Sequence, residues 1–148
     1  FDVDGILPGG GLYFSEKGES IKRFNVLDGY GIKQLIDYGI NVGLISSRDH
    51  KATRTRAKEL GIKVLMLKVP NKLQAFEAWS KKNKVNPLFC GHMGDDLADL
   101  ELFAKVGFSA SVPNACDEIK LAADWVSVKL GGHGAVRELS DLIIKING

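Results

Sequence analysis

The sequence predicts an α/β protein with a parallel β-sheet that is covered by helices on both faces. Short apolar runs of strand length alternate along the chain with segments in which apolar residues recur every three or four positions. This alternation is typical of strands joined by helical crossovers. The runs are apolar throughout, which indicates strands buried on both faces. A chain of 148 residues is about the size of one domain, so we predict a single domain over residues 1–148.

Apolar spacing and helix ends predict the helices. Ile32, Leu35 and Ile36 fall on one face of a first helix, and Gly39 follows it where glycine commonly ends helices. Gly61 ends the second helix in the same way. The later predicted helices cover residues 51–60, a segment that includes 73–79, and residues 97–105, 119–122 and 135–146.

The strands are predicted from apolar runs that lie between these helices. They cover residues 40–45, 63–67, 88–93, 108–112 and 125–128. A further strand is expected to lead into Asp2. Because the sequence starts at Phe1 without an initiator methionine, we expect that this first strand is present only in part.

Residues 9–24 interrupt the alternation and predict a β-hairpin inserted after the first strand. Three glycines lead into the apolar run 12–14, a polar turn covers residues 15–19, and a second apolar run covers 21–24. An isolated two-stranded hairpin is only marginally stable in water. Its aromatic face is therefore expected to pack against another surface, and a second subunit is one candidate.

Composition and charge exclude several classes of protein. Twenty Lys and Arg against eighteen Asp and Glu leave a net charge of +2, which is too balanced to indicate binding to nucleic acid or to an anionic membrane surface. No apolar run approaches the roughly 20 residues of a transmembrane helix. Cys90 and Cys116 lie in apolar contexts, and we expect two reduced thiols in a cytoplasmic protein.

Side chains suited to catalysis or ligand binding follow several of the predicted strands. Asp2 and Asp4 follow the first strand, Ser46 ends the next one, and Asp95 follows a later one. Lys72 opens the helix after another strand. Because ligands bind beyond the carboxyl ends of parallel strands, we expect these five side chains to meet at one edge of the sheet.

The acidic residues of this group predict a magnesium site. Asp2 and Asp4 are two apart in an extended segment, so their side chains leave the same face. Two carboxylates about 4 Å apart repel by about 4 kcal/mol at an effective dielectric constant of about 20, and Asp95 adds to the repulsion. A few oxygen ligands suit Mg²⁺ with several waters retained. An acidic turn alone is common, and Lys72 alone fits a surface lysine; their combination favours a site for Mg²⁺ and phosphate.

These residues resemble the motifs of a known family. Asp-Val-Asp-Gly at 2–5, Ser46, Lys72 and Gly-Asp-Asp-Leu-Ala-Asp at 94–99 are similar to the motifs of the haloacid dehalogenase-like phosphotransferases. The segments 24–33, 46–48 and 131–138 narrow the resemblance to the 3-deoxy-D-manno-octulosonate 8-phosphate (KDO 8-phosphate) phosphatase family. The similarity covers essentially the whole chain. It implies a Rossmann-like haloacid dehalogenase fold with a hairpin insertion and no cap domain.

The resemblance implies a role for each matching residue. Asp2 would attack phosphorus to form an aspartyl-phosphate, and Asp4 would protonate the leaving sugar oxygen and then activate water. Asp2, Asp95 and the backbone carbonyl of Asp4 would hold Mg²⁺, and Ser46 and Lys72 would bind the phosphoryl group. The implied reaction releases KDO and phosphate in lipopolysaccharide biosynthesis, and the hairpin of the family assembles a homotetramer.

The resemblance also implies residues that contact the sugar acid. These are Asn25, Asp28, Gly29, Lys33, Arg48 and Arg56. A planar guanidinium suits bidentate pairing with the carboxylate of a sugar acid. Taken alone, Arg56 and Lys33 fit an exposed helix face as well as they fit a substrate contact. For Arg54, the exposed helix face is favoured over a substrate contact.

The sequence departs from the family's pattern at Pro8, Gly9, Leu27 and Ser47. Pro8 and Gly9 replace polar residues at the start of the hairpin, so the hairpin geometry is expected to differ. Ser47 replaces a glycine and restricts the backbone, which is expected to weaken phosphate binding. Leu27 stands where an arginine is common, which is expected to reduce contact with the sugar acid.

Two other functions stay open at this point. One is a phosphatase for a nine-carbon, sialic-acid-type 9-phosphate, although Arg48 favours the eight-carbon substrate because the nine-carbon enzymes tend to carry an acid there. The other is a non-catalytic assembly domain of the same fold. That reading is disfavoured because Asp2, Asp4, Asp95 and Asp96 are all present.

Overall fold

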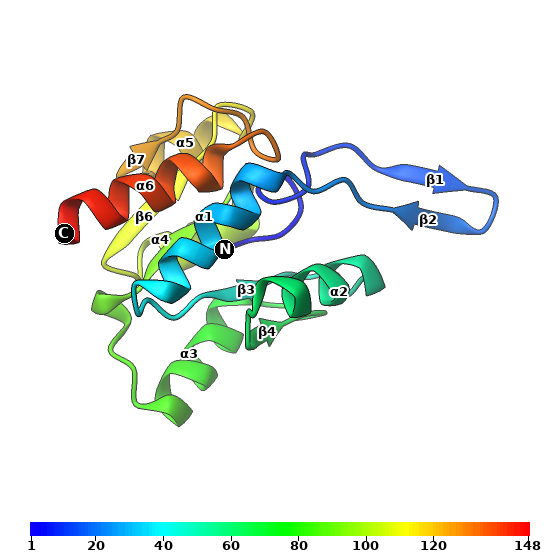
Figure 1. The fold of residues 1–148 in the computed structure, drawn as a ribbon. Coiled ribbons are helices and arrows are strands. Elements are labelled where there is room, and N and C mark those ends of the chain that lie inside the picture. The colour runs from blue at the N-terminus through cyan, green and yellow to red at the C-terminus, as the bar shows by residue number, and fades with distance from the viewer.

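A computed structural model describes residues 1–148, apart from the side chains of Glu19 and Ser20 (Figure 1). The α-helices are α1 (Val26–Asp37), α2 (Lys51–Leu60), α3 (Lys72–Asn83), α4 (Leu100–Phe103), α5 (Asp117–Ala122) and α6 (Ala135–Asn147). The strands are β1 (Tyr13–Ser15), β2 (Gly18–Ile21), β3 (Gly43–Ile45), β4 (Val64–Met66), β5 (Gly91–Met93), β6 (Phe108–Ser111) and β7 (Trp125–Val126). The predicted α/β class is confirmed.

The first two residues connect two groups of parallel strands into one layer. β3 pairs with β4, and β5, β6 and β7 pair in that order, all in parallel. Between these groups, the Phe1 amino group donates to Gly43 O at 2.9 Å, and the Ile45 N–H donates to Phe1 O at 2.9 Å. On the other side, the Asp2 N–H donates to Met93 O at 2.9 Å. Asp2 therefore lies where the chain order reverses from one side of the sheet to the other, which is where ligands bind in such sheets.

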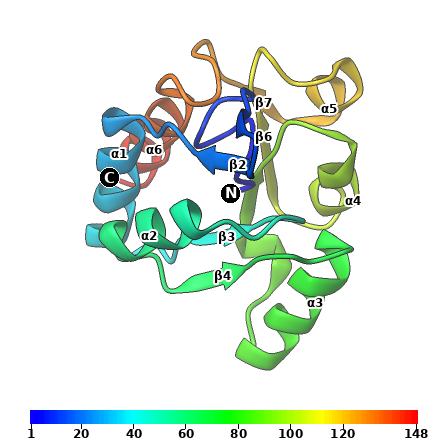
Figure 2. The same ribbon diagram turned by 90° about the vertical axis from the view of Figure 1, so that its right-hand side faces the viewer.

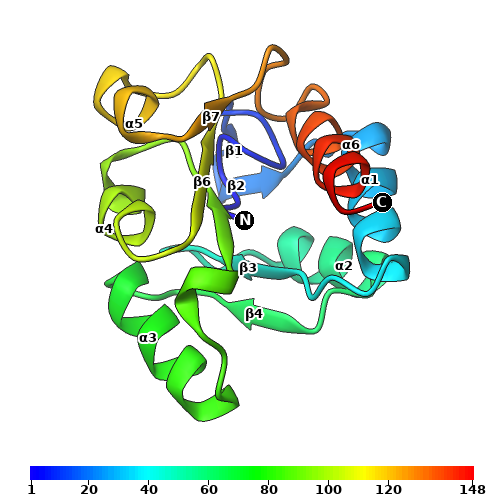
Figure 3. The same cartoon turned by 90° about the vertical axis from the view of Figure 1, so that its left-hand side faces the viewer.

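Helices cover both faces of this layer (Figures 2 and 3). α1, α2 and α6 lie on one face, where α1 packs along α6, and α3, α4 and α5 lie on the other. The largest fully buried apolar side chains include Ile6, Ile32 and Leu44. No helix of the described residues is long and apolar enough to cross a membrane.

The predicted hairpin is confirmed and projects from the body of the domain (Figure 1). β1 and β2 are antiparallel, with an irregularity in register between Tyr13 and Phe14. An isolated antiparallel bridge between Pro8 and Phe24 closes the base. Pro8 thus lies outside a continuous ladder, at a position where the missing N–H of proline is tolerated.

All five predicted strands of the sheet are shorter than the apolar runs that predict them, and in two of them neighbouring contacts give the reason. In the segment 88–93, Pro87–Phe89 form a 3-10 helix because the Asn86 side chain accepts from the Leu88 N–H and Pro87 occupies the first turn. Only Gly91–Met93 remain as strand. In the segment 125–128, the strand ends at Val126, since the Glu138 carboxylate takes the N–H groups of residues 128 and 129. The predicted helix 97–105 consists of two parts in the structure, a 3-10 turn over 97–99 and the helix α4.

Candidate active site

Asp2 is a buried carboxylate at the carboxyl edge of the sheet. Asp2 directly follows Phe1, whose backbone is hydrogen-bonded to β3. The residue is 6% exposed. The Val3 N–H donates to Asp2 Oδ1 at 2.7 Å. Burial raises the pKa of Asp2, and the negative charge of Asp99 raises it further, against the opposing effect of Lys72.

Lys72 reaches Asp2 from the start of α3. Asn71 caps this helix by accepting from the Gln74 N–H at 2.8 Å, so Lys72 occupies the first turn. The Lys72 ammonium lies 2.8 Å from Asp2 Oδ1 and 2.7 Å from Asp99 Oδ1. Burial alone would lower the pKa of Lys72, but the two carboxylates raise it above its usual value. The ammonium group therefore stays charged although it is buried.

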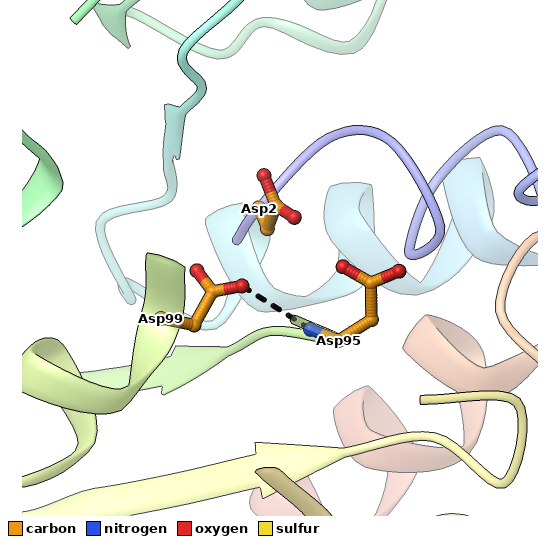
Figure 4. A group of neighbouring side chains, drawn as sticks. All are labelled: Asp2, Asp95 and Asp99. Atoms are coloured by element: carbon orange, nitrogen blue, oxygen red, sulfur yellow. Dashed lines mark hydrogen bonds between the residues drawn. The ribbon is translucent and has the colours of Figure 1, made fainter. Parts of the chain in front are cut away.

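Asp99 is fully buried, and donors surround both of its oxygens. Oδ1 lies 2.7 Å from Lys72 Nζ and 2.7 Å from His92 Nε2. Oδ2 accepts from the Asp95 N–H at 3.2 Å (Figure 4). It also accepts from the Asp96 N–H at 3.4 Å. Burial alone would raise the pKa of Asp99, but His92 and Lys72 hold it at about 2. Asp99 thus orders the loop after β5 and orients Lys72.

Asp2 and Asp95 are the carboxylates best suited to a metal ion. One oxygen from each of Asp2, Asp95 and Asp99 lies within 4.8 Å of the others. Both oxygens of Asp99 and Oδ1 of Asp2 already have protein donors, so Asp2 Oδ2 and the Asp95 carboxylate are left to a cation. Burial and the negative charge of Asp2 raise the pKa of Asp95 to about 8. A divalent cation between two such carboxylates would remove this repulsion, so the residues fit Mg²⁺.

Two glycines leave room for this carboxylate cluster. Gly5 has φ +87°, and a Cβ there would lie 1.8 Å from Asp95 Oδ2. A Cβ on Gly94 would lie 2.3 Å from Asp99 Cγ. Any side chain at either position would displace a carboxylate, which explains why both acidic motifs contain glycine.

Asp4 lies apart from the carboxylate cluster, at a more open position. Its side chain is 27% exposed, and Asp4 Oδ1 lies 2.6 Å from Lys22 Nζ. Asp4 Oδ2 lies 3.9 Å from a guanidinium nitrogen of Arg48. The carboxyl group is not part of the metal cluster found among the described residues; the contribution to a metal that the resemblance implies is that of its backbone carbonyl.

Ser46 lies at the same edge of the sheet. It directly follows β3, whose Ile45 N–H is bonded to Phe1 O, so Ser46 lies at the end of the strand that runs beside Phe1 and Asp2. Ser46 is 4% exposed, and its Oγ accepts from the Arg48 N–H at 3.1 Å. The hydroxyl proton remains available for a phosphate oxygen.

Most of the predicted substrate residues lie on α1 and α2 and have structural contacts. The Asn25 side chain caps α1, and the backbone carbonyl of Asn25 accepts from the Arg56 guanidinium at 3.2 Å. Gly29 makes room for that arginine, since a Cβ there would lie 2.2 Å from the Arg56 guanidinium. Asp28 is 1% exposed, and Lys33 is exposed on the surface of α1.

The Asp28 carboxylate binds the start of α6. It accepts from the Gly134 N–H at 3.2 Å and the Arg137 N–H at 3.0 Å. Burial raises the pKa of Asp28 in spite of these hydrogen bonds. Arg48 is therefore the predicted substrate residue that the structure brings to the reactive carboxylates, next to Asp4.

Sequence reasoning missed three residues of the site. Asp99 was visible only as part of the motif 94–99, and its spacing of four from Asp95 was the available signal. His92 directly precedes Met93 in β5 and gave no signal beyond a buried position. Lys22 belongs to the hairpin, and no local spacing connects it to Asp4.

Comparisons with known proteins identify the family of this chain. A profile of the haloacid dehalogenase-like hydrolases matches residues 64–139. The chain is 42% identical over 147 residues to the 3-deoxy-D-manno-octulosonate 8-phosphate phosphatase of Haemophilus influenzae, which covers 99% of this chain and 82% of the relative.

Solved structures extend the similarity to the whole fold. The Moraxella catarrhalis 3-deoxy-D-manno-octulosonate 8-phosphate phosphatase, in complex with magnesium, phosphate and KDO, has a TM-score of 0.94 at 40% identity and covers 97% of this chain and 83% of that one. The cobalt-bound enzyme of Haemophilus influenzae has a TM-score of 0.93 at 42% identity and covers 97% and 84%. This chain belongs to the haloacid dehalogenase-like hydrolases, within the 3-deoxy-D-manno-octulosonate 8-phosphate phosphatase family.

Proposed function

We propose that this protein hydrolyses KDO 8-phosphate to KDO and inorganic phosphate, with Mg²⁺ as cofactor. The observation that carries the proposal is the convergence of Asp2, Asp95 and Lys72 at the point where the sheet reverses its order. Such a pocket pairs an anionic nucleophile and metal site with a fixed positive charge, and phosphoryl transfer is catalysed by this arrangement.

Asp2 and Asp4 divide the chemistry between them. The Asp2 carboxylate attacks phosphorus and forms an aspartyl-phosphate, while the bond from phosphorus to the sugar oxygen breaks and Asp4 gives its proton to that oxygen. Asp4, now a carboxylate, then takes a proton from the water that attacks the aspartyl-phosphate. Phosphate leaves, and both side chains return to their starting states.

Lys72 and Ser46 hold the phosphoryl group during these steps. The Lys72 ammonium already touches Asp2, so the phosphoryl oxygens would come to rest beside a charge that is in place before the substrate binds. The Ser46 hydroxyl donates a further hydrogen bond. Asp2, Asp95 and the backbone carbonyl of Asp4 would hold Mg²⁺, which would supply positive charge to neutralise the phosphoryl oxygens.

Arg48 is our candidate for the carboxylate of the sugar acid. Its guanidinium lies beside Asp4 and its side chain is 42% exposed, so a ligand at the mouth of the site can reach it. Arg56 is held by Asn25 O and Glu59, and Asp28 by α6. Contacts of Asn25, Asp28, Gly29, Lys33 and Arg56 with the substrate stay predictions from the resemblance.

We also propose that the hairpin assembles a homotetramer. Leu12, Tyr13, Phe14 and Ile21 are 49–66% exposed on a segment that projects from the domain (Figure 1), and copies of the chain packed together would bury these side chains. Light scattering on Phe14→Glu tests this proposal, with Leu121→Glu, an even more exposed apolar position on α5, as the control. A tetramer that persists in the Phe14 variant would contradict it.

We propose a cytoplasmic location for the protein. Both cysteines are free, which supports this location.

A panel of acidic sugar phosphates tests the proposed activity. The purified protein is expected to release phosphate from KDO 8-phosphate when Mg²⁺ is present and to stop when a chelator removes it. Faster release from a nine-carbon sugar-acid 9-phosphate would reassign the substrate. Failure to release phosphate from any member of the panel would instead favour the non-catalytic assembly domain.

A further inference from the structure

The hairpin contributes a buried cation to the candidate active site. Lys22 follows β2, and its side chain is 4% exposed. Its ammonium lies 2.6 Å from Asp4 Oδ1. A lysine is almost never buried to this extent unless an anion pairs with it, so the position of Lys22 is tied to the carboxyl group of Asp4.

The two oxygens of Asp4 have different surroundings. Oδ1 has a short, charge-assisted contact with Lys22, whereas Oδ2 lies 3.9 Å from Arg48, beyond hydrogen-bond length. The torsion of a carboxyl group is soft and roughly two-fold, so a strong contact at one oxygen fixes the direction of the other. Oδ2 is therefore the oxygen that Asp4 presents to a substrate.

We propose that Lys22 is a positioning residue that holds Asp4 so that Oδ2 faces the leaving sugar oxygen. This inference rests on the proposed phosphatase function and names a residue that acts through Asp4. Other contacts hold the base of the hairpin to the domain: Pro8 bridges Phe24, and the Arg23 guanidinium donates to Gly132 O at 3.4 Å. The hairpin thereby delivers its lysine to a fixed point.

The choice of leaving group separates this role from a general structural one. A sugar alkoxide needs a proton to depart, whereas p-nitrophenolate departs without one. The value of kcat/KM reports the steps through departure of the leaving group, so it isolates the acid role of Asp4 from its later role as a base. Loss of the correct Asp4 orientation should therefore affect a sugar phosphate and spare p-nitrophenyl phosphate.

The test compares Lys22→Met, Lys22→Arg and Lys17→Met, the last being a control at an exposed lysine in the turn of the same hairpin. For KDO 8-phosphate, Lys22→Met is expected to lower kcat/KM by about tenfold or more, part of the contribution of a general acid. For p-nitrophenyl phosphate, kcat/KM should change by less than about threefold. Lys22→Arg should recover most of the loss, and Lys17→Met should match the wild type.

Two results would overturn the inference: equal losses on both esters, or no loss on the sugar phosphate. If Lys22→Met does not fold, Lys22→Gln replaces it and the same contrast between esters applies. Failure of the proposed function is distinguishable, because the wild-type protein would then release no phosphate from any sugar phosphate in the presence of Mg²⁺.

Discussion

The ammonium group of Lys72 lies 2.8 Å from Asp2 Oδ1 and shares its charge with Asp99, 2.7 Å away on its other side. One lysine thus compensates two buried carboxylates, the proposed nucleophile Asp2 and the structural carboxylate Asp99. The cluster still carries more negative than positive charge when Asp95 is ionised. A divalent cation would bring positive charge to this cluster, and a phosphoryl group that binds with it would bring negative charge.

Removal of the Lys72 charge should impair both activity and stability. We expect Lys72→Met to lower kcat by about 100-fold or more, since a preorganised donor to the transferring group is lost. The free energy of unfolding should fall by about 3–5 kcal/mol, because Asp2 and Asp99 are left buried without their cation. Phosphate release and urea denaturation measure these effects. Lys81→Met, an exposed lysine of the same helix, should change neither, and full activity in the Lys72 variant would contradict its assigned role.

Gly5 should be required for magnesium binding. In Gly5→Ala, the new methyl group would meet Asp95 Oδ2 and the backbone would be strained at φ +87°. Displacement of Asp95 should raise the Mg²⁺ concentration that gives half-maximal phosphate release by about tenfold or more, as is typical when the surroundings of a metal ligand are disturbed. Gly10→Ala is the matched control, because nothing lies within 4 Å of a Cβ at that position. Equal magnesium requirements in the two variants would refute the prediction.

In contrast to the substrate contact that the resemblance implies, the hydrogen bonds of Asp28 to α6 predict that this residue acts on stability rather than on substrate binding. In Asp28→Ala, the N–H groups of Gly134 and Arg137 lose their buried acceptor, and the free energy of unfolding should fall by about 1–3 kcal/mol. The KM for KDO 8-phosphate should stay within about threefold of the wild-type value. A carboxylate that does not bind the substrate can be removed without raising KM. Urea denaturation and steady-state kinetics check both parts. A large rise in KM with unchanged stability would restore Asp28 as a substrate ligand.

His92 should make stability depend on pH. Burial lowers the pKa of His92 from 6.5 to about 4, so the folded protein keeps this imidazole neutral while the unfolded chain takes up a proton. As the pH falls from 6.5 to 4, the free energy of unfolding should therefore decrease, by up to about 3 kcal/mol from this residue. His92→Gln, which can still donate to Asp99, should lack this contribution.

Urea denaturation of both proteins at several pH values, with metal removed by a chelator, measures the difference. Titration of Asp2 and Asp95 is common to the two proteins and largely cancels in the comparison. Parallel pH profiles for wild type and variant would show that His92 is not the responsible group.

Local patterns in the sequence predict most of the elements and the reactive edge. The helix expected over residues 51–60 lies at Lys51–Leu60, because Gly61 adopts the left-handed conformation that ends it. The Asn71 cap places Lys72 in the first turn of α3, as expected. Asp2 and Asp95 are brought together because a parallel sheet collects the carboxyl ends of its strands at one edge.

Contacts between distant segments could not be predicted in this way. Asp28 and Gly134 are separated by 106 positions, and no periodicity indicates that a carboxylate on α1 caps α6. Lys22 meets Asp4 only because the chain returns to the first loop after β2, where Pro8 bridges Phe24. The 3-10 helix at Pro87–Phe89 replaced the start of a predicted strand, since a side-chain cap at Asn86 competed successfully with an apolar pattern.

Phosphate release from KDO 8-phosphate by wild type and Asp2→Asn, with and without Mg²⁺, tests the central claim most directly. The wild-type protein should release phosphate only with Mg²⁺ and should carry the phosphoryl group on Asp2 when the reaction is quenched and the peptide is weighed by mass spectrometry. Asp2→Asn should lose activity by about 10⁴-fold or more, as expected for loss of a covalent nucleophile. Equal Mg²⁺-dependent activity in the two proteins would contradict the account.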